Sequence, residues 1–260
     1  MQKRLWTQAG LLMLSCILTS CAALWPPEPI TAPPRPPEPA LASRQAIVVT
    51  ASDWGCVDGV LQGFERKKEG APWELAIEKI PVVVGRNGMG WGIGLHPLTI
   101  PEGPVKREGD GKAPAGIFRL SSGFGYAATE DVSWIRLTYR QATPKLLCID
   151  DPRSVYYNRI VDATRMENDW KSRERMLRRD DLYRLGIVVD HNTDPPAAGK
   201  GSCIFMHIWK GPSHGTAGCT AMALHHLQRL LLWLDPAAMP VLMQLPDPEY
   251  AHLRLLWHLP

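Results

Sequence analysis

The sequence has almost no net charge once its first segment is set aside. Lys3 and Arg4 lie in the first 20 residues, which contain no acidic residue, and removing them from the 29 Lys and Arg residues leaves 27 against 26 Asp and Glu residues. This balance gives neither the basic surface of a nucleic-acid-binding protein nor the polybasic segment that binds an anionic membrane. We therefore expect no nucleic-acid partner.

The sequence also lacks a long hydrophobic run near its start. Residues 9–18 form an apolar run, but a transmembrane helix needs about 20 such residues. Because Lys3 and Arg4 precede the run and small residues follow it, the pattern is typical of an export signal. We predict a signal peptide over residues 1–20.

Cys21 follows this segment directly. Residues 18–21, Leu-Thr-Ser-Cys, resemble the bacterial lipoprotein box, in which the signal is cleaved before the cysteine and the cysteine is lipidated. The alternative is ordinary signal cleavage after residues 21–23. As a lipoprotein, the chain would meet the membrane through the lipid on Cys21 alone, and Ala22 in place of aspartate favours the outer membrane. We expect the protein on the periplasmic face of the cell envelope.

Signals for phosphate binding and for internal repeats are absent. The glycine-rich segments 86–94 and 108–118 lack the Gly-x-x-x-x-Gly-Lys-Ser/Thr spacing of a phosphate-binding loop. Such segments form tight turns in which glycine supplies a positive φ. Alternatively, they line a cleft where the backbone approaches a substrate closely. We expect no cofactor.

The chain is long enough for one good-sized core, since 45% of its 260 residues are hydrophobic. Residues 26–39 are rich in proline, which predicts an extended tether. We therefore predict a lipidated cysteine and a Pro-rich spacer over 21–45, a folded domain over 46–246 and a C-terminal tail over 247–260.

The pattern of the folded domain predicts strands more often than helices. Short β-branched runs bounded by turn residues predict strands over 46–50, 80–84, 186–190, 204–208 and 240–245. Apolar spacing of three and four residues predicts helices over 168–184 and 223–234. The expected fold class is mostly β with short helices, of the α+β type.

Residues 199–222 carry the candidate chemistry. On the strand predicted over 204–208, alternation places Ile204 and Met206 on a core face. His207 and Trp209 then fall on the opposite face, which suits a pocket wall. The loop that follows, residues 210–215, allows Cys219 to fold back toward His207.

A thiol attacks a carbonyl as its thiolate, and a neighbouring imidazole or a helix N-terminus lowers the pKa of the thiol. We predict both effects for Cys219, with His207 as the base and the helix predicted after Cys219 as the source of backbone N–H groups. The amides of Gly218 and Cys219 would hold the oxyanion of a tetrahedral intermediate. A glycine at 218 would leave room for the reacting carbonyl.

A metal site is the alternative for the same stretch, because its cysteines and histidines are ligands by residue type. The residues concerned are Cys203, His207, His214 and Cys219. Cys203 and His207 lie four residues apart on a predicted strand, a separation of about 13 Å, which is too long for two ligands of one ion. We predict no metal.

Four cysteines remain after Cys21, namely Cys56, Cys148, Cys203 and Cys219. In an oxidising compartment, with Cys219 free as the nucleophile, the other three allow one disulfide and leave one odd thiol. The sequence does not show which two of Cys56, Cys148 and Cys203 would form the disulfide.

Three motifs in combination resemble the catalytic domain of YkuD-type L,D-transpeptidases, in their exported and lipoprotein branch. They are Gly199-x-Gly-Ser-x-Ile-Phe-x-His207, Thr216-x-Gly-Cys219 and Gly109-Asp-Gly-Lys-x-Pro-x-Gly116. Segments 150–154, 157–158 and 191–194 also match, and the resemblance covers about residues 46–246. It implies a mixed β-sandwich catalytic domain that acts on peptidoglycan stem peptides.

The resemblance also implies a reaction. Cys219 attacks the carbonyl of the third stem residue, with His207 as base and Gly218 in the oxyanion site, and the terminal D-residue leaves. A neighbouring amine then takes the acyl group, which cross-links the cell wall. Ala217 and Ala221 replace the histidine and the arginine of the family's commonest motif, Ser-His-Gly-Cys-x-Arg. The second replacement removes a contributor to substrate positioning.

Further residues near these motifs are candidates for substrate binding: Ser202, Asn192, Trp209 and His214. His214 could compensate for the histidine missing at Ala217, and either Asn192 or a backbone carbonyl could orient His207. Two other functions remain open. One is an L,D-carboxypeptidase or a hydrolase of wall cross-links with the same Cys219 and His207 site, and the other is a non-catalytic wall-binding lipoprotein.

Overall fold

The computed structural model describes residues 41–97 and 102–260. The predicted signal peptide, the predicted lipidation site at Cys21 and residues 21–40 of the predicted tether lie outside the described residues. Among the residues that are described, no helix has the length and apolar character needed to cross a membrane.

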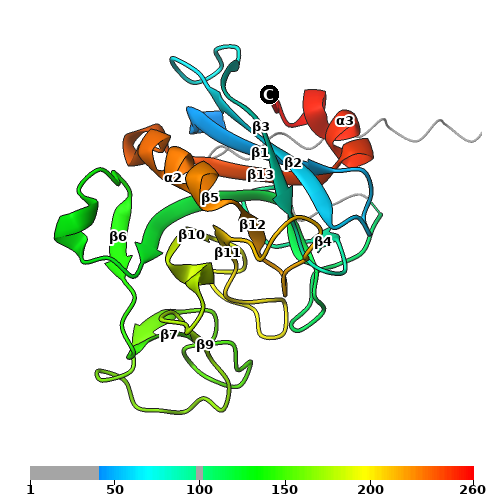
Figure 1. Cartoon of the computed structure of the whole chain (residues 1–260). Helices are drawn as coiled ribbons and strands as arrows, with labels where there is room; N and C mark the ends of the chain where they lie inside the picture. Colours follow the sequence, from blue (N-terminus) through cyan, green and yellow to red (C-terminus); the bar gives the residue numbers. More distant parts are fainter. Residues whose placement is uncertain (1–40, 98–101) are drawn as a thin grey trace, which may run out of the picture. The chain divides into compact units, whose positions relative to one another are not determined.

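Eight strands form a closed barrel (Figure 1). Each strand is hydrogen-bonded to the next around the ring, and the last pairs with the first. In ring order they are β5 (Ala113–Gly125), β10 (Leu185–Val189), β11 (Phe205–Ile208), β12 (Thr220–Met222), β3 (Glu74–Val83), β2 (Asp58–Glu65), β1 (Gln45–Ala51) and β13 (Val241–Pro246).

The pair β1 and β13 runs through the centre of the fold. The two strands are parallel, with Ile47 opposite Leu242. Every residue of β13 is buried, and so is every residue of β1 except Thr50. Strands covered on both faces read as continuous hydrophobic runs, which is why the sequence marks these two strands clearly.

Two helices pack on the barrel. Helix α2 (Leu224–Trp233) buries Leu227, Leu230 and Leu231 against it and lies next to β10 and β11. Helix α3 (Asp247–Leu256) lies against β13 and β1. Residues 247–260, expected as a tail, thus contribute to the core: Leu253, Trp257 and Leu259 are all buried.

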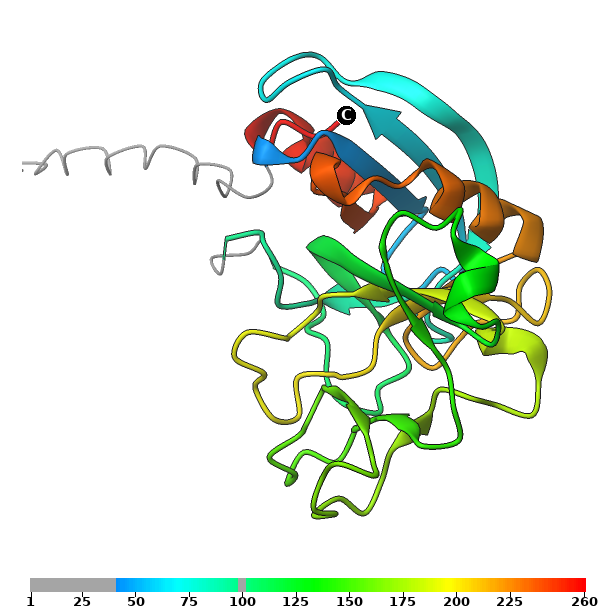
Figure 2. The ribbon, with the colours of Figure 1, turned by 90° about the vertical axis from the view of Figure 1, so that its left-hand side faces the viewer.

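The remaining elements are short. Strands β4 (Met89–Trp91) and β6 (Thr138–Gln141) pair with β5 outside the ring, and a separate sheet has the order β8 (Ile160–Asp162), β7 (Leu146–Cys148), β9 (Glu174–Arg175). Three 3-10 helices are η1 (Thr129–Val132), η2 (Asp181–Tyr183) and η3 (Pro236–Ala238). In two views at right angles, the segment with β7 and β9 lies at the end of the domain opposite α3 (Figure 1, Figure 2).

The structure confirms the mostly β, α+β class and the five predicted strands, as well as the helix predicted over 223–234. The helix predicted over 168–184 is wrong, because this segment holds only β9 and η2. Side chains take over backbone donors that a helix would use: Asp151 accepts from the N–H of Lys171, and Asp180 from that of Leu182. Such bonds compete with helix formation.

Candidate active site

His207 lies on β11 with the orientation that alternation predicts. Met206 is completely buried in the main core, whereas Phe205 belongs to a second apolar cluster on the other face of the strand. His207 shares that second face and contacts the ring of Tyr183, with 5.2 Å between ring centroids. Strand β11 thus divides the core from the candidate site.

The imidazole of His207 is oriented by backbone. Its Nδ1 lies 2.8 Å from the carbonyl oxygen of Ile208. Because a carbonyl oxygen only accepts, Nδ1 is the protonated nitrogen and Nε2 carries the free lone pair. Of the two orienting groups that the sequence left open, the structure therefore uses a backbone carbonyl.

Cys219 directly precedes β12, the neighbour of β11 in the barrel. The two strands are parallel, with His207 opposite Ala221. The Cys219 sulfur accepts a hydrogen bond from the N–H of Phe205 at 3.4 Å and lies 3.7 Å from the carbonyl oxygen of Cys203. Backbone before and within β11 thus surrounds the thiol.

The predicted helix N-terminus behind the thiol is wrong. Strand β12 comes between Cys219 and α2, and α2 begins only at Leu224. Residues 220–222 have to complete the barrel between β11 and β3, so they extend instead of turning into a helix. The thiol therefore gains no stabilisation from a helix dipole.

Burial determines the protonation states of the Cys219 thiol and the His207 imidazole in the free protein. Cys219 is 6% exposed and His207 is 7% exposed. Loss of solvent raises the pKa of the Cys219 thiol to about 12 and lowers the pKa of the His207 imidazole to about 4. The lowered thiol pKa expected from the sequence is thus wrong for the free protein, which holds a neutral thiol beside a neutral imidazole.

A cavity of about 290 Å³ brings the two groups together. Among the residues predicted as functional, Cys219, His207, Trp209 and His214 line it. Since both reactive groups open into one cavity, a substrate carbonyl bound there can meet the thiol while the imidazole takes its proton.

Gly218 stands between two residues that line this cavity, Ala217 and Cys219, but its N–H is already used in a hydrogen bond. It donates to the hydroxyl oxygen of Thr216 at 3.0 Å, and that hydroxyl donates to the carbonyl oxygen of Cys219 at 2.6 Å. No group in the described ranges accepts a hydrogen bond from the N–H of Cys219. The Cys219 amide is therefore the better oxyanion donor of the two.

The structure adds a packing reason for glycine at 218. A Cβ there would lie 3.0 Å from the carbonyl oxygen of Lys112 and 3.4 Å from Ile204. The loop that ends at Lys112 thus packs closely against Gly218, and this packing by itself favours a residue without a side chain.

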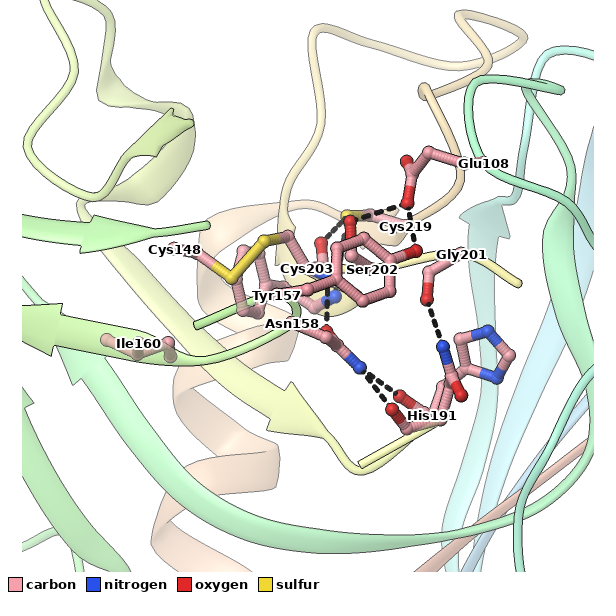
Figure 3. Close-up of a disulfide and its surroundings, with 12 residues drawn as sticks. Glu108, Cys148, Tyr157, Asn158, Ile160, His191, Gly201, Ser202, Cys203 and Cys219 are labelled. Carbon is pink, nitrogen blue, oxygen red and sulfur yellow. Dashed lines mark hydrogen bonds between the residues drawn. A yellow bond between two sulfur atoms is a disulfide. The ribbon is translucent and has the colours of Figure 1, made fainter. Parts of the chain in front are cut away.

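Asn192 and Ser202 are not part of this cavity. The amide of Asn192 is used within its own loop, where it bonds backbone groups of Ala197 and Gly201. The hydroxyl of Ser202 donates to Glu108 at 2.7 Å (Figure 3). Both side chains hold loops in place, so the structure gives them no direct contact with a substrate at Cys219.

A disulfide joins Cys148 of β7 to Cys203, just before β11 (Figure 3). Asn158 accepts a hydrogen bond from the N–H of Cys203 at 2.8 Å. Because the carbonyl of Cys203 lies beside the Cys219 sulfur, this disulfide ties the small sheet to the surroundings of the thiol. Cys56 is left as the other free thiol within the described chain, and Cys203 is not free to bind a metal.

The sequence named no role for three other residues that line the cavity, Glu174, Arg178 and Tyr183, whereas Arg86 begins segment 86–94, for which a cleft wall was one of the two interpretations. Arg178 bonds Glu174 at 2.7 Å and Asp180 at 2.8 Å, and its guanidinium lies over the Tyr183 ring. The prediction of a helix over 168–184 hid the roles of Glu174, Arg178 and Tyr183, since it placed the two charged side chains on a solvated face and counted Tyr183 among the apolar residues. Arg86 follows a strand and begins the glycine-rich segment 86–94, and its place in the cavity agrees with the interpretation of this segment as a cleft wall.

Metal chemistry finds no support from the arrangement of side chains. Within residues 41–97 and 102–260, no three His, Cys, Asp or Glu residues are grouped as a metal site would require. The acidic group in the cavity, Glu174, is paired with Arg178.

No family model matches the sequence, and no curated protein matches it. Among solved structures, the chain is similar to one described as the structure of Bdellovibrio bacteriovorus Bd1075, with 14% sequence identity and a TM-score of 0.37 over 80% of this chain and 50% of that one. The chain thus spans about half the length of that protein. A similarity of this size does not establish a common fold.

Proposed function

We propose that this protein is a cysteine-dependent L,D-transpeptidase that acts on peptidoglycan stem peptides. The observation that carries the proposal is the shared cavity of His207 and Cys219, which the parallel neighbours β11 and β12 bring to one side of the barrel. We also propose that the domain has the YkuD type of α+β fold, a proposal supported by the sequence motifs around these two residues.

The first half of the reaction forms a thioester. The sulfur of Cys219 attacks the carbonyl carbon of the third stem residue while Nε2 of His207 takes the thiol proton. The carbonyl oxygen becomes an oxyanion that accepts a hydrogen bond from the Cys219 N–H. The intermediate collapses when the carbon–nitrogen bond breaks, and the imidazolium returns its proton to the departing D-residue amine.

The second half transfers the acyl group. An acceptor amine loses a proton to His207 as it attacks the thioester, and the Cys219 thiolate leaves and is reprotonated. Because burial makes both charged forms costly at rest, the thiolate and the imidazolium arise together, when substrate fills the cavity. This order protects the thiol from oxidation between turnovers.

Mass spectrometry of the purified domain with a disaccharide-tetrapeptide tests the proposal. We expect loss of the terminal D-residue, an acyl adduct on the protein and cross-linked dimers. Cys219→Ala should abolish all three, while Cys56→Ala, which removes the other free thiol, should retain them. The absence of any Cys219-dependent product would contradict the proposal.

The same assay separates the alternative acceptors. Tripeptide without dimers would identify water as the acceptor, hence an L,D-carboxypeptidase, and split cross-links would identify a wall hydrolase. Peptidoglycan binding that is unchanged by Cys219→Ala, with no product, would identify a wall-binding lipoprotein. We further propose that a lipid on Cys21 anchors the domain at the periplasmic face of the outer membrane, next to this substrate.

A further inference from the structure

Arg86 is the one arginine in the cavity whose charge is left unpaired by the described residues. The other arginine that lines it, Arg178, is neutralised by Glu174 and Asp180. No carboxylate in the described ranges pairs with the guanidinium of Arg86, and its side chain is exposed. An unpaired guanidinium beside a nucleophile attracts an anionic group of the substrate.

The fold builds a fixed position for Arg86. Its N–H donates to the carbonyl oxygen of Thr216 at 2.8 Å, which ties it to the loop that leads to Cys219. The preceding residue, Gly85, bridges both to Gly88 and to Thr216. The backbone of Arg86 is therefore held on the cavity wall.

Two glycines from different loops make space for this arginine. A Cβ on Gly111 would lie 3.1 Å from Cγ and from Cζ of Arg86. A Cβ on Gly215 would lie 2.5 Å from the Arg86 Cα, a distance that real Cβ atoms do not reach. The loop of Gly111 thus packs on the side chain of Arg86 and the loop of Gly215 packs on its backbone, and of these two glycines Gly215 lines the cavity together with Arg86.

Strand pairing explains how an arginine reaches this place. Ala221 of β12 lies opposite Val83 of β3, and Arg86 follows Val83 by three residues. Ala221 is completely buried and has no polar group to offer. The segment that follows the neighbouring strand therefore supplies a cationic group to the cavity, in addition to Lys210.

We propose that Arg86 binds a carboxylate of the stem peptide and so positions the scissile carbonyl at Cys219. This inference rests on the proposed function. A guanidinium binds a carboxylate through two parallel hydrogen bonds, which fixes the direction of the bound group as well as its place. A donor stem offers two carboxylates near the scissile bond: that of the terminal D-residue and that at the distal D-centre of a diamino acid.

Isothermal titration with Cys219→Ala tests this subsite without turnover. The ligands are the disaccharide-tetrapeptide and two forms of it, one amidated at the terminal residue and the other at the distal D-centre. Adding Arg86→Gln should weaken binding of the unmodified stem by at least about tenfold, the usual effect of losing a charge-assisted pair. Arg86→Lys should recover part of the loss, because it keeps the charge without the second hydrogen bond.

The amidated ligands identify the carboxylate. For the ligand that lacks the carboxylate bound by Arg86, Arg86→Gln should have no effect. Arg229→Gln, on the exposed side of α2 and outside the cavity, is the matched control and should bind like the parent. Because Arg86 is exposed, we expect its variants to unfold at the parent temperature.

The outcomes separate this inference from the proposed function. Suppose that Arg86→Gln leaves the affinity for the stem unchanged in the Cys219→Ala background, while the chain that retains Cys219 still cleaves the stem. This result would overturn the role of Arg86 and leave the proposed function intact. A loss of the same size for all three ligands would also overturn it, since the effect would then not depend on a carboxylate. A parent chain that neither binds nor cleaves the stem would overturn both.

Discussion

Nδ1 of His207 donates to the carbonyl oxygen of Ile208, the next residue on its own strand, at 2.8 Å. In a serine protease triad a carboxylate holds the imidazole and stabilises its charged form. Here a neutral carbonyl takes that place, so it fixes the tautomer without offsetting the burial that keeps the ring neutral. The proposed base is therefore oriented for proton transfer but uncharged in the free protein.

Stability should be greatest between about pH 6.5 and 9. Burial lowers the pKa of His207 from 6.5 to about 4, so between these values the unfolded chain binds a proton that the folded chain does not, and acid destabilises the fold. Burial raises the pKa of Cys219 from 9.0 to about 12, so alkali above pH 9 also destabilises it. Thermal unfolding as a function of pH measures both slopes.

Two variants test how much His207 contributes to the loss of stability in acid and how much Cys219 contributes to the loss in alkali. Relative to the parent, His207→Gln should reduce the fall of stability below pH 6.5 without removing it, because burial also lowers the pKa of His191 to about 4, and Cys219→Ala should reduce the fall above pH 9. Parallel pH profiles for the parent and both variants would contradict the assigned protonation states.

Alkylating reagents should modify Cys56 faster than Cys219. Cys56 is partly exposed, whereas Cys219 is buried and the raised pKa of its thiol leaves almost no thiolate at pH 7. Iodoacetamide labelling followed by peptide mapping should show Cys56 modified at least about tenfold faster in the native protein. Equal rates in denaturant provide the control, and faster native labelling of Cys219 would contradict a neutral thiol.

Thr216→Val should lower activity more than Thr216→Ser. The hydroxyl of Thr216 joins the Gly218 N–H to the Cys219 carbonyl, and valine keeps its shape but leaves both groups unsatisfied. Such a loss costs about 1–3 kcal/mol, and at Cys219 it also frees the backbone that carries the nucleophile. We expect a fall in kcat/KM of about tenfold or more for valine, little change for serine, and the opposite order would refute the role of this hydroxyl.

Removal of the disulfide should destabilise the fold and slow acylation. Cys148 and Cys203 close a loop with a sequence separation of 55, for which chain entropy predicts about 4 kcal/mol. The double variant Cys148→Ser, Cys203→Ser should lower the free energy of unfolding by an amount of that order. Stem-peptide acylation at a temperature where the variant remains folded should also slow, because the Cys203 carbonyl lies beside the thiol; an unchanged rate would limit the disulfide to stability.

The sequence predicted those parts of the fold that depend on local pattern. Runs such as residues 46–50 and 240–245 are almost entirely buried and are hydrophobic except at Thr50 and Gln244, so the sequence pattern predicts strands there. Closure of the ring was not predictable, because the pairing of β5 with β10 joins segments about 60 residues apart in sequence. The helix prediction over 168–184 failed because the apolar residues of this segment, although spaced as in a helix, pack into two separate clusters. Trp170 belongs to one cluster and Met176 to the other.

The candidate site was predictable where one strand or one motif defines it. Alternation on β11 gave the face of His207, and the spacing to Cys219 suggested a fold-back that the parallel pairing of β11 and β12 provides. The protonation states were not predictable, since they depend on burial by elements distant in sequence, such as Tyr183. The role of Arg86 was not predictable for the same reason, because only the pairing of β3 with β12 brings this residue to the cavity.

The parallel pairing of β1 with β13 has a consequence for biosynthesis. These strands are the first and last of the barrel along the chain, and Ala51 lies opposite Pro246. The ring cannot close until residue 246 has left the ribosome, so a nascent chain has no complete barrel at any earlier length. Until β13 has been made, the edges of β1 and β5 with which it pairs stay open.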